Sequence, residues 1–147
     1  MTAPIITLMD AYMLERLLAR GISKESLVQS IHAHTLNQYN GTEHSFDYSE
    51  LDTAVDGKES IYGEAILDGY AVSYMTINGL KNLLKMKFGF LENKDYTPYE
   101  AKLEKLVVIP IQLEVINKMI GRVWTVQITN EASAETIEIS IKHVSLV

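Results

Sequence analysis

The sequence contains no cysteine, which excludes disulfide bonds, thiolate nucleophiles and zinc or iron–sulfur sites held by cysteine. It also lacks a long hydrophobic run. The longest stretch without a polar residue covers residues 106–111, far short of the roughly 18 residues that a membrane-spanning helix needs. No basic segment precedes an apolar stretch near residue 1, as a secretory signal peptide would require. We therefore expect a cytoplasmic protein without a membrane anchor.

Basic residues are outnumbered, with 13 Lys and Arg against 19 Asp and Glu, and the formal net charge is −6. The imbalance is concentrated between residues 43 and 68, where Lys58 is the only base. A negatively charged surface repels nucleic-acid phosphates and attracts cationic partners, so we expect no nucleic-acid binding. The alternative is a solvated acidic face that only aids solubility. The candidate contacts for a basic protein partner are Asp47, Glu50, Asp52 and Glu59.

The length of 147 residues and the hydrophobic content of 47% are typical of one globular domain. Helical and strand-like periodicities both occur, so we predict a single α+β domain over residues 1–147. Its predicted parts are an N-terminal helical hairpin (1–41), an acidic, antiparallel three-stranded β-meander (42–77), short connecting helices (78–104) and a second antiparallel three-stranded β-meander (105–147).

Apolar residues at helical spacing mark the N-terminal segment. Asp10 can cap a first helix over residues 10–20, and Ser23 can cap a second over residues 24–39. This spacing superficially suits a DNA-reading helix-turn-helix, but Lys24 is the only basic residue on the second helix. We therefore predict a packing hairpin. The apolar stripe of the first helix is Met13, Leu14, Leu17 and Leu18.

Two Asp-Gly pairs punctuate the acidic segment, at residues 56–57 and 68–69. Asp-Gly is a strong signal for a two-residue type I′ hairpin, because both central positions need positive φ. The pairs predict strands over residues 45–55, 58–67 and 70–77. Strand alternation then places four aromatic residues on one face: Phe46, Tyr48, Tyr70 and Tyr74. These side chains either pack in a core or an interface, or form a stacking platform for a ligand.

Two helix starts are predicted in the connecting segment. Thr76 or Asn78 can cap a helix that carries a leucine-rich stripe. The run Thr97-Pro98-Tyr99-Glu100 has the form of a capping box with proline at the first helical position, which predicts a second short helix to about Leu103.

From Lys105 the apolar residues repeat with a period of two. We predict a strand over residues 107–116, a turn at residues 117–118, a partner strand over residues 120–128 and a last strand near residues 136–142. Pro110 has no N–H, which places the first of these strands at a sheet edge. An exposed edge and mixed sheet faces indicate a homo-oligomer. The last strand sends Ile137, Ile139 and Ile141 to one face.

The sequence holds none of the motifs G-x-S-x-G, P-loop, G-x-G-x-x-G or H-E-x-x-H. His32 and His34 have the spacing of a metal-binding H-x-H. On the predicted helix, however, their rings point roughly 200° apart and cannot chelate together. We predict no metal ion and no cofactor. An enzyme has the least support, since a hydrolase built on Glu43, His44 and Asp47 is singled out by nothing in the sequence.

The leading hypothesis is a non-enzymatic, small acidic binding or inhibitory protein that docks a partner protein. Immunity proteins and phage-encoded inhibitors have this general profile. The first alternative is an oligomer that binds a small anionic ligand on the aromatic face, with Arg122 or the lysines of residues 81–105 holding the anionic group. A hydrolase with an unrecognised site is the second alternative.

Overall fold

The computed structural model describes residues 3–40, 47–120, 123–130 and 135–146. The described chain has an α+β fold with six α-helices and two sheets. The helices are α1 (Leu8–Ala19), α2 (Lys24–Ala33), α3 (Tyr48–Val55), α4 (Glu59–Asp68), α5 (Ile77–Phe88) and α6 (Pro110–Met119), with 3-10 turns η1 (Leu36–Tyr39) and η2 (Val144–Leu146). The strands are β1 (Ile5–Ile6), β2 (Ala71–Val72), β3 (Thr97–Pro98), β4 (Lys102–Val108), β5 (Trp124–Asn130) and β6 (Ile137–His143).

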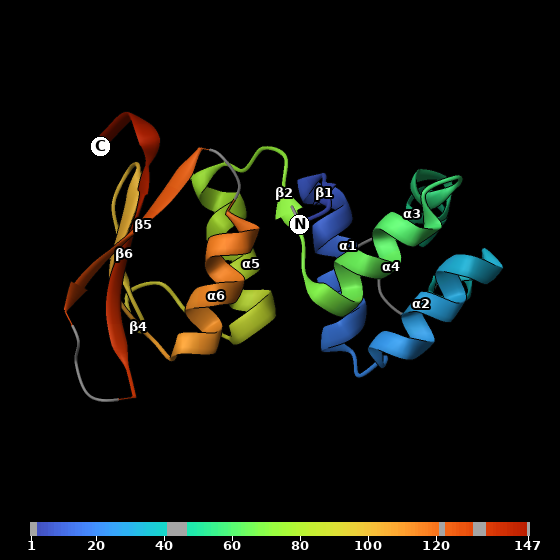
Figure 1. The fold of residues 1–147 in the computed structure, drawn as a ribbon, viewed down its shortest axis with the longest axis horizontal. Helices are drawn as coiled ribbons and strands as arrows, with labels where there is room; N and C mark the ends of the chain where they lie inside the picture. The colour runs from blue at the N-terminus through green and yellow to red at the C-terminus, as the bar shows by residue number, and fades with distance from the viewer. Residues whose placement is uncertain (1–2, 41–46, 121–122, 131–134, 147) are drawn as a thin grey trace.

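The elements are arranged in layers. The sheet of β4, β6 and β5 lies on one side, α5 and α6 cover its inner face, and α1 to α4 lie beyond them (Figure 1). The short parallel pair β1–β2 lies between the two helical groups (Figure 1). One continuous cluster of buried apolar side chains runs through all layers, from Leu17 on α1 through Leu83 on α5 to Ile139 on β6.

Both N-terminal helices form, but they do not pack as the predicted hairpin. The Thr7 side chain caps α1, and Asp10, predicted as the cap, lies in its first turn. Ser23 caps α2 as predicted. α2 ends earlier than predicted, because His34 adopts the left-handed conformation with φ 56°. α1 packs mainly on α5 and α2 mainly on α4, so each buries its apolar stripe against a later helix.

The predicted acidic β-meander over residues 42–77 is wrong, because α3 and α4 occupy most of its described part, residues 47–77. Burial follows helical spacing there: Tyr48, Leu51 and Val55 on α3, then Tyr62, Ala65 and Ile66 on α4. Gly57 and Gly69 have the positive φ values, 77° and 102°, that the Asp-Gly pairs indicated. They occupy a turn between two helices and the C-terminus of α4 instead of two hairpins.

The connecting segment contains one of its two predicted helices. α5 begins after Thr76, whose hydroxyl accepts a hydrogen bond of 3.0 Å from the Gly79 N–H. Thr97 and Pro98 do not start a helix. They form β3, which pairs antiparallel with Glu104 and Leu103 of β4, because the chain folds back immediately after Pro98.

The predicted C-terminal three-stranded meander is wrong in its first strand and in its strand order. β4 ends at Val108, and Pro110 becomes the first residue of α6, a position where its missing N–H removes no hydrogen bond. The Gln112 side chain accepts a hydrogen bond of 3.0 Å from the Ile109 N–H and stabilises this start. Helical burial of Ile116 and Met119 replaces the expected alternation.

The last predicted strand is present as β6 and occupies a central place. The sheet order is β3-β4-β6-β5, so β6 pairs with both β4 and β5. Ile139 pairs with Leu106 on one side and with Ile128 on the other. Ile139 and Ile141 of the predicted apolar face are fully buried, but Ile137 is half-buried and Ser140, on the opposite face, is buried as well. Within the described residues, no helix is both long and apolar enough to cross a membrane.

Candidate functional site

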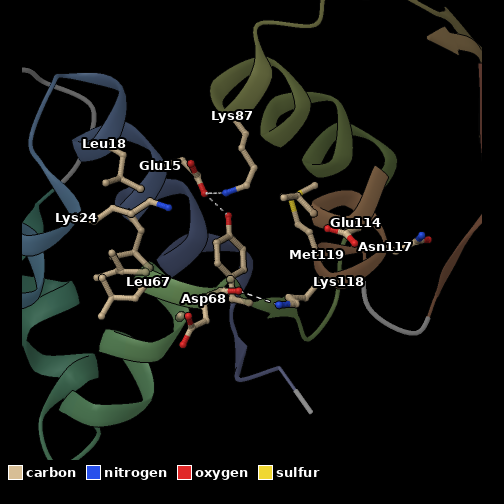
Figure 2. A pocket seen from close by; sticks show the side chains of 16 residues that line it. Glu15, Leu18, Lys24, Leu67, Asp68, Lys87, Glu114, Asn117, Lys118 and Met119 are labelled. Carbon is tan, nitrogen blue, oxygen red and sulfur yellow. Dashed lines mark hydrogen bonds and ion pairs between the residues drawn. The ribbon is translucent and has the colours of Figure 1, made fainter. Parts of the chain in front are cut away.

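A cavity of about 670 Å³ lies where α1, the end of α4, α5 and α6 converge. This volume falls within the roughly 300–1,000 Å³ of small-molecule pockets. Figure 2 shows that charged and apolar side chains from these separate elements line the same space. The apolar lining includes Leu14, Leu18, Leu67 and Met119.

The floor of the cavity is a connected group of three residues. The Tyr70 hydroxyl donates a hydrogen bond of 2.6 Å to Glu15 Oε2, and Lys87 Nζ donates to the same oxygen (Figure 2). Lys87 Nζ also lies 4.9 Å from the centroid of the Tyr70 ring, in a cation–π contact. Burial raises the pKa of the Tyr70 hydroxyl, and the adjacent Glu15 carboxylate raises it further. Tyr70 therefore remains a protonated donor.

Two further lysines stand at the rim. Lys24, the first residue of α2, directs its ammonium group toward the cavity (Figure 2). Lys118 on α6 donates a hydrogen bond of 2.8 Å to the Asp68 backbone carbonyl. Because an ammonium group has three donors, this bond leaves Lys118 able to bind a ligand as well. Asp68 and Glu114 also line the cavity, so the lining lysines and carboxylates balance in formal charge.

Local structure explains how Tyr70 reaches the floor. Gly69 ends α4 with φ 102° and ψ 167°, a backbone conformation that is essentially restricted to glycine. This reversal turns the chain into β2 and points Tyr70 toward α1. Lys87 lies in the last turn of α5, where a cation also suits the negative end of the helix dipole.

The predicted aromatic ligand residues do not share a surface. Tyr70 lies in the cavity, whereas Tyr48 is buried on α3, edge-on to the Tyr39 ring at a centroid distance of 6.5 Å. Tyr74 is 65% exposed in the segment before α5. Phe46 and Arg122 lie outside the described residues. Among the lysines of residues 81–105, Lys87 reaches the cavity.

The predicted partner-binding acids lie on α3 and at the start of α4. Asp47 caps α3, and the hydrogen bond from the Ser49 backbone N–H lowers the pKa of the Asp47 carboxyl. Glu50 is exposed. Asp52 and Glu59 both contact the His34 ring, at 3.4 and 2.8 Å. The structure therefore gathers two of the four acids around one histidine.

Sequence reasoning missed Glu15, Lys24 and Lys118 as cavity residues. Glu15 is only 4% exposed in the structure, but it lies outside the apolar stripe of the predicted helix, so the sequence pattern did not mark it as buried. A carboxylate in that position needs a partner. Lys24 and Lys118 carry no sequence signal either, because their place at the cavity depends on how distant helices pack.

Comparison with known proteins gives no match to any protein-family model, curated protein or solved structure.

Proposed function

We propose that the protein is a binding protein whose cavity between α1, α4, α5 and α6 holds a small amphipathic molecule with an anionic group. The observation that carries this proposal is the convergence of Lys24, Lys87 and Lys118 on one hollow that also has an apolar wall. The lysines supply donors for a carboxylate or phosphate. The leucine and methionine side chains supply the surface for an apolar body.

The floor of the cavity favours binding over chemistry. Tyr70 and Lys87 both donate to Glu15, so the three side chains are held in place before any ligand arrives. A fixed arrangement lowers the entropic cost of binding. Tyr70 keeps its proton because burial raises its pKa, so it is a poor general base.

The experiment compares three naphthalene probes of one size and different charge: 2-naphthoate, 2-naphthol and 2-naphthylmethylammonium. Each is titrated into isotopically labelled protein while backbone amide shifts are recorded. We expect 2-naphthoate to bind most tightly and to shift amides of α1, α5 and α6. Equal binding of all three probes, or shifts elsewhere only, contradicts the proposal.

A pair of lysine variants tests the role of charge. Lys24→Met keeps the aliphatic stem and removes the ammonium group at the rim. Loss of one charged hydrogen bond should weaken 2-naphthoate binding by about tenfold. Lys94→Met removes an exposed lysine that does not line the cavity and should leave the affinity unchanged.

A second candidate function is docking of a basic protein on the acidic residues of α3 and α4. It is supported by the number of carboxylates that these two short helices carry. Asp47, Asp52 and Glu59 have structural contacts, so Glu50 and Glu64 are the better residues to neutralise. With a partner purified from the cells of origin, the Glu50→Gln, Glu64→Gln variant should associate about tenfold more slowly at low salt. The control variant Glu25→Gln, Glu100→Gln has the same net charge but keeps the acids of α3 and α4, so it should associate as fast as the parent protein.

A further inference from the structure

His34 occupies an unusual position at the end of α2. Its backbone is left-handed, with φ 56° and ψ 47°, and it forms the C-cap of the helix. The ring lies against the turn between α3 and α4, and each of its two nitrogens faces carboxylate oxygens. His32, two residues earlier, is not part of this group.

Three atoms converge on one side of the ring. His34 Nε2 lies 2.8 Å from Glu59 Oε2 and 4.0 Å from Asp56 Oδ1, and all three ligand atoms lie within 4.8 Å of one another. A zinc ion bonded at about 2.0–2.1 Å to each ligand holds tetrahedral ligand atoms roughly 3.3 Å apart. The observed separations of 2.8 and 4.0 Å from Nε2 lie on either side of that value, so small side-chain movements would bring all three ligand atoms to bonding distance from one ion. The Gly57 N–H, at 3.3 Å from Glu59 Oε2, helps to hold this oxygen in place.

The other nitrogen of the ring has its own carboxylate. His34 Nδ1 lies 3.4 Å from Asp52 Oδ1, an atom that is fully buried and makes no hydrogen bond. A metal-bound histidine commonly donates its second N–H to a carboxylate, which fixes the ring orientation and the tautomer. Asp52 Oδ1 is placed to accept that proton from Nδ1. Without a metal, Nε2 hydrogen-bonds Glu59 Oε2 at 2.8 Å, so a bound metal ion would displace the Nε2 proton and take its place between Nε2, Asp56 and Glu59.

We infer that His34, Asp56 and Glu59 bind a divalent transition-metal ion such as Zn²⁺, with Asp52 orienting the histidine. One imidazole nitrogen and two carboxylate oxygens suit zinc. Three protein ligands leave a fourth position open to solvent, and Asp56 and His34 are exposed.

The charges favour a metal over a simple ion pair. Three carboxylates surround one imidazole, so the group carries −2 when His34 is protonated and −3 when it is neutral. A divalent cation on neutral His34 reduces this to −1. The same ion would join the end of α2 to the α3–α4 turn. This inference does not depend on the cavity, which is lined by other residues.

The test is titration calorimetry of metal-free protein with ZnCl₂, with Co²⁺ absorption spectra to report the coordination number. We expect one saturable site per chain. His34→Asn is the main variant, because asparagine tolerates the left-handed backbone and so preserves the fold. It should weaken Zn²⁺ binding by at least tenfold, and Asp52→Asn should weaken it by about tenfold.

The matched control is His32→Asn, which removes an exposed histidine from the same helix and should leave the affinity unchanged. Zn²⁺ should also raise the thermal unfolding midpoint of the parent protein but not of His34→Asn, because a ligand that binds only the folded state stabilises it. Equal binding by the parent and His34→Asn, or an equal loss in His32→Asn, overturns the inference. So does the absence of a saturable site.

Discussion

Tyr70 donates a hydrogen bond of 2.6 Å to the carboxylate of Glu15, which lies 55 residues earlier in the chain. Glu15 is almost fully buried, and Lys87 is its second partner. A buried carboxylate is costly unless it is paired and hydrogen-bonded, so the bonds from Tyr70 and Lys87 offset the free-energy cost of burying Glu15. The contact joins α1, the chain after α4 and α5 at the floor of the cavity.

The first prediction follows from that contact. Tyr70→Phe removes the hydroxyl and leaves Glu15 with one donor fewer in a buried setting. Hydrogen bonds to charged groups contribute about 1.5–3 kcal/mol, so the free energy of unfolding in urea should fall by that amount. Tyr74→Phe, at an exposed tyrosine, should change it by less than about 0.5 kcal/mol. A loss of unfolding free energy in Tyr70→Phe as small as the one in Tyr74→Phe would show that the Tyr70 hydroxyl makes no net contribution to stability.

Alkaline pH should destabilise the fold through its buried tyrosines. Burial raises the pKa of Tyr96 to about 12 and also raises the pKa values of Tyr62 and Tyr70. In the unfolded chain a tyrosine ionises near pH 10. Above that pH the folded state holds more protons than the unfolded state, so the stability present below pH 10 is lost as the pH rises.

This pH dependence is measured by urea unfolding between pH 9 and pH 12. The Tyr62→Phe, Tyr70→Phe double variant should lose stability less steeply over this range than the parent protein. The phenolate absorbance of the native protein should rise at a higher pH than that of the protein unfolded in urea. Identical slopes for parent and variant would contradict the raised pKa values.

The sequence correctly predicted a helix where a capping residue directly precedes a stripe of apolar residues at helical spacing. α5 has both, with Thr76 at the cap and leucines at helical spacing, and it forms as expected. The prediction for the acidic segment was wrong because an Asp-Gly pair indicates a positive φ but does not determine whether the flanking segments are strands or helices. Asp56 has φ −58° and ψ 122°, Gly57 has φ 77°, and the Lys58 N–H bonds the Val55 carbonyl at 2.7 Å. These values describe a type II turn between two helices.

Proline misled in a related way. A helix was predicted at Pro98 and a strand through Pro110, and the structure has the reverse. Both positions suit either element locally, because proline fixes φ but not the following chain. Pairing of β3 with β4 and burial of Ile116 against the core decide the outcome, and these contacts are non-local. The cavity also depends on non-local contacts that the sequence does not reveal, since its lysines come from three helices.

Gly69 provides the third prediction. Its φ of 102° and ψ of 167° disfavour any residue with a side chain, and an added Cβ would lie 3.0 Å from Lys118 Cδ. Gly69→Ala should therefore lower the free energy of unfolding by about 1–3 kcal/mol. Gly63→Ala is a matched control in the middle of α4, where the nearest atom lies 3.7 Å away and alanine favours the helix. A more stable Gly69→Ala variant would contradict the backbone conformation at the end of α4.

The last prediction concerns Trp124, the single tryptophan of the chain. Its indole N–H donates a hydrogen bond of 2.8 Å to the Met75 carbonyl, and its ring meets His143 edge-on at 5.3 Å. Trp124 belongs to β5, whereas Met75 precedes α5, so the bond joins the sheet to the helical layer. Trp124→Phe leaves a buried carbonyl without its donor and should cost about 1–3 kcal/mol of stability. Gln127→Ala, exposed on the same strand, should change stability by less than about 0.5 kcal/mol.

The same residue reports whether the layers unfold together. Trp124 is buried in the one apolar cluster that also contains Leu17 of α1 and Leu83 of α5. Loss of the sheet contacts should therefore coincide with loss of the helices in a single cooperative transition. In urea, the midpoint from tryptophan fluorescence should equal the midpoint from far-ultraviolet circular dichroism. A fluorescence transition at clearly lower urea would mean that the sheet detaches while α1 to α4 stay folded, and that the shared cluster contributes little to their stability.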